Sequence, residues 1–107
     1  MATCTWTGGS GQKYDYRVLK LPRSFTPGKG NYIYTKLNAQ GTHWVPVYIG
    51  EGELKDRSQP DNHHKGSCIV RNGATHIHWH TRHDTSQRAR RDEEDDLLQN
   101  YSSPCND

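Results

Sequence analysis

The sequence predicts a small α+β domain, in which an antiparallel or mixed sheet of three strands is flanked by helices, on three observations. Two runs rich in β-forming residues, 31–37 and 44–49, lie close together in the chain. A third run, 75–80, alternates apolar and polar residues. The segment 87–101 contains neither Pro nor Gly and is rich in helix-forming residues.

The first two predicted strands should pair as an antiparallel hairpin, because residues 38–42 between them, Asn-Ala-Gln-Gly-Thr, are typical of a turn. After Gly50, residues 51–57 include good helix formers, and residues 58–62 contain a Pro that ends helical structure. We therefore expect a helix of two turns that ends near Arg57.

The predicted third strand follows an Asn-Gly turn at residues 72–73. Side chains alternate across a strand, so Ile77 and Trp79 should share one face. Three histidines should share the other face: His76, His78 and His80. With the last helix, the expected order is β-β-α-β-α.

The N-terminal part of the chain shows weaker signals. Residues 7–12 are turn-forming, so we expect the first dozen residues to be a loop or a mobile arm. Residues 14–18 read as a strand-like piece, which ends before Pro22 and a turn at 27–30. We therefore divide the chain into an N-terminal arm, 1–27, and a domain, 28–107.

Composition sets limits on the class of protein. The 107 residues fit one domain, and 14 basic against 12 acidic residues permit DNA binding without demanding it. The three cysteines are odd in number and far apart, which predicts reduced thiols rather than a disulfide framework or a cysteine zinc site. Without an apolar run of membrane-spanning length or a secretory signal, we expect an intracellular, cytoplasmic protein without membrane contact.

The last predicted helix, which Thr85 or Ser86 can cap, carries an unusual carboxylate. Leu97, Leu98 and Tyr101 follow Glu94 at helical spacing, so Glu94 should lie on the face that packs on the sheet. A carboxylate there is costly unless it is paired or binds a cation. The alternative without a functional role is a surface ion pair of Glu94 with a preceding arginine, Arg90 or Arg91.

Four motifs in the order of one family carry the functional prediction. The triplets Gly30-Asn31-Tyr32 and Tyr48-Ile49-Gly50 come first, and residues 51–57 after them end in an arginine. Residues 94–106 then run from a Glu through two leucines and a Pro to Asn106. Together these motifs resemble the GIY-YIG nuclease family over residues 28–107.

Two positions depart from the family pattern. Asn31 stands where the first triplet usually has Ile, at a position that is not catalytic in the family. The interval of 16 positions between Tyr32 and Tyr48 is longer than typical, which indicates an insertion in the hairpin loop.

The resemblance implies a metal-dependent DNA endonuclease with a one-metal mechanism. Glu94 would hold a Mg²⁺ or Mn²⁺ ion that keeps waters and phosphate oxygens as its other ligands. Arg57 would bind the scissile phosphate through a bidentate contact. The hydroxyls of Tyr32 and Tyr48 would orient or deprotonate the attacking water.

The remaining family positions would support the site. His64, or its neighbour His63, would act as acid or base, since imidazole titrates in the useful range. Asn106 would brace the site by hydrogen bonds, and Gly50 would give close backbone access. DNA is the expected partner, and a homodimer is one way for so small a domain to gain sequence specificity.

Two other readings compete with the nuclease. The three strand histidines at 76, 78 and 80 share one face, as in a zinc or copper site. Alternatively, the chain is a noncatalytic nucleic-acid-binding module that contacts phosphates through arginines. The candidate arginines for that role are Arg82, Arg88, Arg90 and Arg91.

Overall fold

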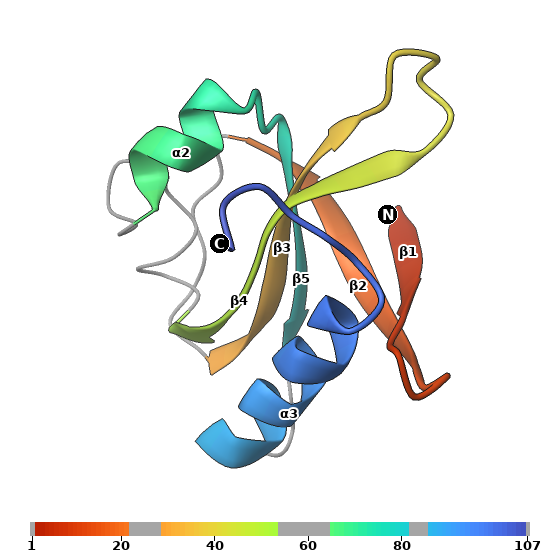
Figure 1. Cartoon of the computed structure of the whole chain (residues 1–107), viewed down its shortest axis with the longest axis vertical. Coiled ribbons are helices and arrows are strands. Elements are labelled where there is room, and N and C mark those ends of the chain that lie inside the picture. The colour runs from red at the N-terminus through yellow and green to blue at the C-terminus, as the bar shows by residue number, and fades with distance from the viewer. Residues whose placement is uncertain (1, 22–28, 54–64, 82–85, 107) are drawn as a thin grey trace.

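The computed structural model describes residues 2–21, 29–53, 65–81 and 86–106 (Figure 1). These residues build one antiparallel sheet of five strands in the order β1-β2-β5-β3-β4, with helix α3 across one face and the short helix α2 near the opposite end. The elements in chain order are β1 (Thr3–Thr7), β2 (Lys13–Lys20), β3 (Lys29–Leu37), β4 (Trp44–Glu53), α2 (Gly66–Arg71), β5 (His76–Thr81) and α3 (Gln87–Leu98).

The expected sheet of three strands flanked by helices is wrong. The described residues are mostly sheet, curled into a half-barrel, and their two helices are short. The added strands are β1 and β2, which pair with each other and extend the sheet through β2 and β5. The strand-like piece predicted at residues 14–18 is part of β2, whereas β1 lies where a loop or a mobile arm was expected.

The predicted hairpin is confirmed. β3 and β4 pair antiparallel, with Tyr34 opposite Tyr48 and a bulge between Tyr34 and Thr35. The third predicted strand is β5, which pairs with β3 on the other side and places Trp79 opposite Tyr32. β3 therefore pairs with a strand at each of its two edges.

Several element boundaries differ from those expected. Residues 51–53 continue β4 instead of beginning a helix, and the rest of that predicted helix lies outside the described residues. Helix α2 was not predicted, because its segment is too short to show a period. Helix α3 begins at Gln87, where Ser86 accepts a hydrogen bond from the Ala89 amide as a cap, but ends at Leu98 rather than Tyr101.

The two faces of the sheet carry separate hydrophobic clusters. The face towards α2, called here the α2 face, has a core that includes Tyr32, Tyr48 and Ile69. The face towards α3, the α3 face, has a core that includes Trp6 and Leu97. As predicted, Ile77 and Trp79 belong to one cluster and the strand histidines face the other way.

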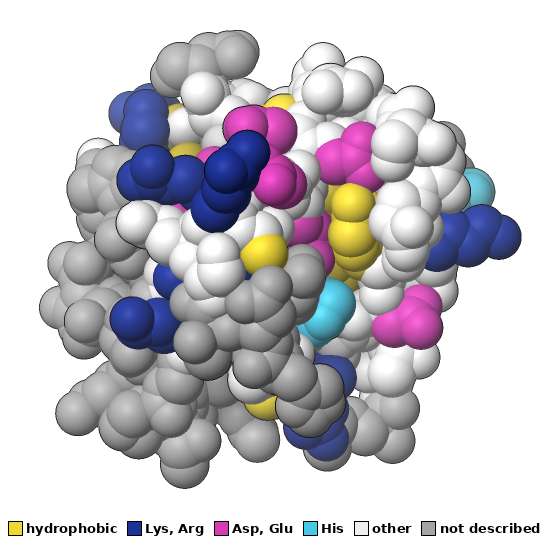
Figure 2. All heavy atoms as spheres, turned by 90° about the horizontal axis from the view of Figure 1, so that it is seen from below, with side chains coloured by type: hydrophobic (Ala, Val, Ile, Leu, Met, Phe, Trp, Pro, Cys, Tyr) yellow, Lys and Arg dark blue, Asp and Glu magenta, His cyan; other side chains and the backbone are white. Residues whose placement is uncertain are grey.

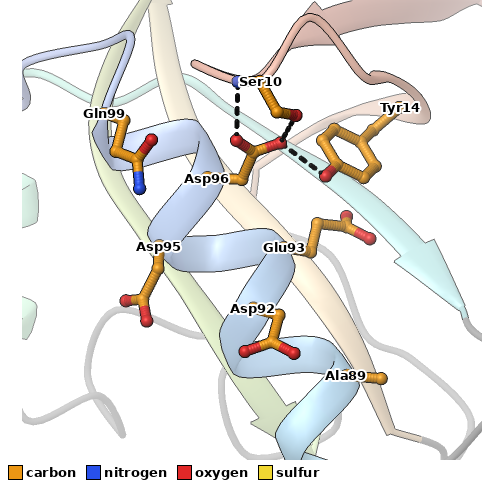
Figure 3. A pocket seen from close by; sticks show the side chains of 8 residues that line it. All are labelled: Ser10, Tyr14, Ala89, Asp92, Glu93, Asp95, Asp96 and Gln99. Atoms are coloured by element: carbon orange, nitrogen blue, oxygen red, sulfur yellow. Dashed lines mark hydrogen bonds between the residues drawn. The ribbon is translucent and has the colours of Figure 1, made fainter.

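The N-terminal hairpin is part of the fold rather than a loop or a mobile arm. The Gly9 amide donates to the Asp96 carbonyl of α3 at 2.8 Å. The Asp96 carboxylate accepts from the Ser10 amide and hydroxyl and from the Tyr14 hydroxyl (Figure 3). These hydrogen bonds lower the pKa of Asp96, because they favour its charged form.

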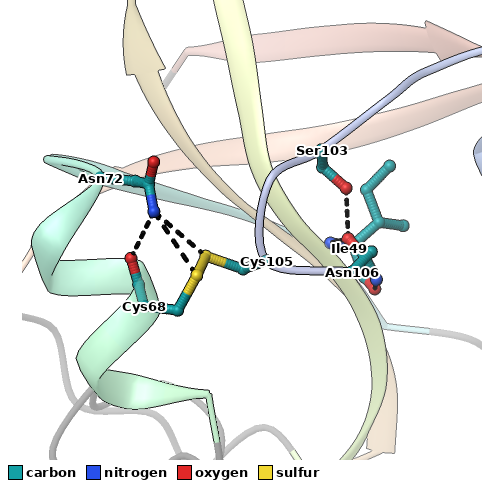
Figure 4. The surroundings of a disulfide bond; sticks show 6 residues. All are labelled: Ile49, Cys68, Asn72, Ser103, Cys105 and Asn106. Carbon is teal, nitrogen blue, oxygen red and sulfur yellow. Dashed lines mark hydrogen bonds between the residues drawn. A yellow bond between two sulfur atoms is a disulfide. The ribbon is translucent and has the colours of Figure 1, made fainter.

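A disulfide joins Cys68 of α2 to Cys105, so the expectation of three reduced thiols is wrong for these two. Cys4 is free. The disulfide was not predicted because its two cysteines are 37 positions apart and the number of cysteines is odd. Only the packing of α2 beside the C-terminal segment brings the two sulfur atoms together (Figure 4).

Within the described ranges, no helix has the length and apolar character needed to cross a membrane.

Candidate active site

Tyr32 and Tyr48 lie side by side in the buried core of the α2 face. Their ring centroids are 6.1 Å apart, and both side chains are buried. Tyr32 is opposite Gly50 in the hairpin register, and a Cβ atom on Gly50 would meet the Tyr32 hydroxyl at 2.6 Å and the Tyr48 ring at 2.7 Å. A glycine is therefore needed here, because the Tyr32 hydroxyl occupies the space that a side chain would fill.

Asn106 clamps the backbone of the second triplet from outside the sheet (Figure 4). Its side-chain amide donates to the Ile49 carbonyl at 2.8 Å, and its side-chain oxygen accepts from the Ile49 amide at 2.7 Å. The Ser103 hydroxyl donates to the same oxygen. Asn106 thus contacts the residue between Tyr48 and Gly50 with both ends of its amide.

Glu94 lies half-buried on α3, the helix that packs on β3 and β4. Burial raises the pKa of Glu94 to about 7, and the charges of Glu51 and Asp95 act in the same direction. The Arg91 charge lowers the pKa but does not cancel these effects. The described residues offer no group of three or more His, Cys, Asp or Glu side chains around Glu94 that could hold a metal ion, so its role as a metal ligand stays a prediction.

Arg90 and Arg91, the alternative ion-pair partners of Glu94, both approach Glu51. Arg90 is buried and its Nε lies 3.0 Å from Glu51 Oε1, while Arg91 Nε lies 4.0 Å from the other oxygen. Asn31, also buried, donates to the Arg90 carbonyl at 2.8 Å. The unusual residue of the first triplet therefore helps to dock α3 on the hairpin, a contact that the sequence did not signal.

Glu93, rather than Glu94, is the carboxylate that α3 buries most deeply. It is 2% exposed and accepts a hydrogen bond of 2.5 Å from the Tyr16 hydroxyl. His80 Nδ1 lies 3.4 Å from the same carboxylate oxygen. The side chains of Tyr16, His80 and Glu93 thus link β2, β5 and α3. Sequence periodicity did not predict this contact, because Tyr16 lies in the predicted N-terminal arm.

The strand histidines do not converge on one metal position. His78 is buried and its Nδ1 accepts a hydrogen bond from Trp6 Nε1 at 3.0 Å. Burial, aided by the charge of His76, lowers the pKa of His78 to about 3, so its ring is neutral. Among the described residues, no group of three or more His, Cys, Asp or Glu side chains could hold a metal ion.

One hollow of the described surface lies between α3 and the β1–β2 hairpin. It has a volume of 660 Å³, and Asp92, Glu93, Asp95 and Asp96 are among its lining residues (Figure 3). Seen from below, acidic side chains gather beside a hollow that shows apolar and His side chains (Figure 2). An acidic surface repels phosphates, so this face does not suit a polyanion.

Three predicted site residues, Arg57, His63 and His64, lie outside the described residues. The other five lie on or beside β4 or its neighbours: Tyr32 on β3, Tyr48 and Gly50 on β4, Asn106 on the outer edge of β4, and Glu94 on α3. The tyrosines lie on the α2 face, whereas Glu94 belongs to α3 on the opposite face of the sheet. The described structure therefore brings Tyr32, Tyr48, Gly50 and Asn106 together but does not bring Glu94 to the tyrosines.

Comparison with protein-family models, with curated proteins and with solved structures finds no match to this chain, so membership of the GIY-YIG family stays a prediction from the four motifs.

Proposed function

We propose that this protein is a GIY-YIG-type endonuclease that hydrolyses DNA phosphodiester bonds with one Mg²⁺ or Mn²⁺ ion. One observation supports the proposal above the others. The hydroxyl of buried Tyr32 occupies the space beside Gly50 and next to Tyr48, which explains why the two triplets need these residue types at these positions.

The residues of the chain divide the work of hydrolysis. Glu94 would hold the metal ion, which when bound stabilises negative charge on the phosphoryl oxygens. Tyr32 and Tyr48 would orient the attacking water or relay its proton, and Arg57 would bind the phosphate. These roles follow from the four motifs and not from the relative position of the side chains, because the tyrosines are buried on the α2 face and Glu94 lies on the α3 face. Asn106 keeps the Ile49 backbone in place and so supports the tyrosine and the glycine on either side.

The competing functions have less support. Arg90 is buried against Glu51, so it is not free to bind a phosphate in a noncatalytic module. Arg88 and Arg91 are exposed, so these two arginines could bind phosphates in a noncatalytic module. A zinc site on the strand histidines lacks support, because His78 already accepts a hydrogen bond from Trp6.

We propose an intracellular, cytoplasmic location with DNA as the partner. A homodimer would supply the second cut that a double-strand break requires. Both statements follow from the proposed activity, and neither is needed for the site chemistry.

The test is cleavage of supercoiled plasmid by the wild-type protein and by Glu94→Gln, with Mg²⁺, with Mn²⁺ and with EDTA. We expect nicking or linearisation by the wild type with either metal ion, and a loss of at least about 100-fold in the variant, as for removal of a key electrostatic group. Asp92→Asn, which removes an exposed carboxylate from the same helix, is the matched control and should cut normally.

A second readout separates metal binding from cleavage. A ligand that binds only the folded state raises its stability, so Mn²⁺ should raise the melting temperature of the wild type and of Asp92→Asn but not of Glu94→Gln. Equal cutting by Glu94→Gln and the wild type would exclude the proposed site, and DNA binding without cutting would favour the binding module.

A further inference from the structure

The C-terminal segment 103–106 covers the outer edge of β4, beside the candidate active site. β4 is the last strand of the sheet, so its outward backbone groups need partners from another segment. The Cys105 amide donates to the Val47 carbonyl at 3.1 Å, and Asn106 makes its two hydrogen bonds with Ile49. The segment therefore holds β4 on both sides of Tyr48.

The disulfide ties this segment covalently to helix α2, which packs beside it. Cys105 is bonded to Cys68 on α2, and the hydrogen bond between Ser103 and Asn106 completes the turn (Figure 4). Asn106 is the next residue after the bridged cysteine. Its side chain can hold Ile49 only while the backbone at 105 stays against β4.

The two sulfur atoms differ in their surroundings. Cys105 is 1% exposed, whereas Cys68 is partly exposed, so a thiol reagent reaches the sulfur of Cys68 more readily. Asn72 Nδ2 lies 3.4 Å from the Cys68 sulfur and 3.6 Å from the Cys105 sulfur. An amide donor at this distance stabilises the negative charge on a departing thiolate.

We propose that Cys68 and Cys105 form a reversible thiol–disulfide switch, acted on by a dithiol reductant, that controls whether the C-terminal segment holds Tyr48 and Gly50 in place. The proposal rests on the proposed function, because its output is cleavage of DNA. Disulfides inside cells are usually transient and regulatory, so a bridge in a protein that cuts intracellular DNA should be reducible.

The exchange reaction balances without any group from the protein beyond the two cysteines. One thiolate of the dithiol attacks the Cys68 sulfur, the bond between the two cysteines breaks, and the Cys105 thiolate leaves and takes up a proton. The second thiol of the reagent then displaces Cys68 as a thiol and closes its own disulfide. The reagent is oxidised by two electrons, and the protein gains two electrons and two protons.

The experiment compares the oxidised protein with the same protein reduced by dithiothreitol. The exchange rate of the Ile49 amide proton, whose hydrogen bond goes to Asn106, is measured by NMR together with plasmid nicking in Mg²⁺. We expect reduction to speed Ile49 exchange by at least about tenfold relative to Ile33 on the interior strand β3, because exchange reports local opening. Nicking should fall by at least about tenfold and recover on reoxidation, since small displacements of positioned groups cost this much.

Two variants complete the design. Cys68→Ala should behave like the reduced protein in both states, with Cys105 left in its buried position, and Cys4→Ser should respond to reduction like the wild type. Equal Ile49 exchange in the oxidised and reduced proteins would overturn the switch. If Ile49 exchange responds but neither state cuts DNA, the nuclease fails and with it the control of cleavage, while the link between the bridge and β4 stands.

Discussion

At the scale of single residues, the space beside the Gly50 Cα is taken by two aromatic side chains. The Tyr32 hydroxyl and the Tyr48 ring both lie within 2.7 Å of the position that a Cβ atom would occupy. Both tyrosines are buried, so neither ring can swing into solvent without opening the core of the α2 face. The absence of a side chain at Gly50 thus leaves the space that the Tyr32 hydroxyl and the Tyr48 ring occupy.

Gly50→Ala should displace Tyr32 and overpack this corner of the core. We expect a loss of about 1–3 kcal/mol in the free energy of unfolding, as for other overpacked cores, measured by urea denaturation. Plasmid nicking should fall by at least about tenfold even where the variant is fully folded, because the Tyr32 hydroxyl moves. If Gly50→Ala kept both the stability and the nicking activity of the wild type, the space beside Gly50 would have no role.

Glu94 should make stability depend on pH in a defined direction. Its pKa rises from 4.5 to about 7 in the folded protein, so the folded state binds the proton more tightly than the unfolded chain. Protonated Glu94 therefore contributes fully to the free energy of unfolding below pH 4.5, and this contribution is lost as the pH rises through about 7.

Glu94→Gln, which cannot ionise, should consequently be more stable than the wild type at pH 8. The gain should be on the order of 1 kcal/mol, after allowance for the partial exposure of the group, and should vanish near pH 4. Urea unfolding of both proteins at the two pH values measures it. The same difference at both pH values would show that crowding of the carboxyl group is not its cause.

At the scale of elements, α3 docks on the hairpin through a buried ion pair. Arg90 of α3 and Glu51 of β4 are 4% and 11% exposed, whereas Arg91, which approaches the same carboxylate, is 65% exposed. An ion pair in water contributes little, but removal of one partner from a buried pair leaves a charge without compensation. The two neighbouring arginines therefore form an internal comparison.

Arg90→Met should lower the free energy of unfolding by about 3 kcal/mol, because Glu51 stays buried without its main partner. Arg91→Met, at the exposed position, should change it by less than about 0.5 kcal/mol. Adding Glu51→Gln to Arg90→Met should recover part of the loss, since the uncompensated charge disappears. Urea denaturation of the four proteins tests this, and equal losses for the two arginine variants would contradict the buried pairing.

At the scale of the whole molecule, the N-terminal hairpin forms one edge of the curled sheet, and its turn contacts α3. Trp6 of β1 and Tyr16 of β2 are buried in the core of the α3 face, and Trp6 donates its hydrogen bond to His78 on β5. The turn between the two strands is bonded to Asp96 (Figure 3). β1 and β2 thus belong to the same sheet as β3, β4 and β5.

A protein that lacks residues 1–21 should fail to fold. The deletion exposes the apolar surface under two buried aromatic side chains, each of which costs about 3–5 kcal/mol when truncated, against a total stability of about 5–15 kcal/mol for a domain. Dispersion of the NMR amide signals and far-UV circular dichroism report the outcome. A folded truncated chain would support a domain that begins near residue 28.

Local patterns in the chain were sufficient for the elements whose signal lies within one segment. Alternation and turn residues predicted the β3–β4 hairpin and β5, and the absence of Pro and Gly after a Ser cap predicted α3. The hairpin register places Tyr32 opposite Gly50, because a hairpin pairs residues near in sequence. These features depend on short-range geometry, which a sequence records directly.

Features that join distant segments depend on packing that no local pattern records. The five-strand order, the Cys68–Cys105 bridge and the burial of Glu93 each bring together residues far apart in the chain. Periodicity placed Glu94 on the inner face of α3, but the position of β2 places Glu93 deeper, beside Tyr16. A helical period gives the spacing of side chains on one helix, whereas the depth of each depends on which strand lies beneath it.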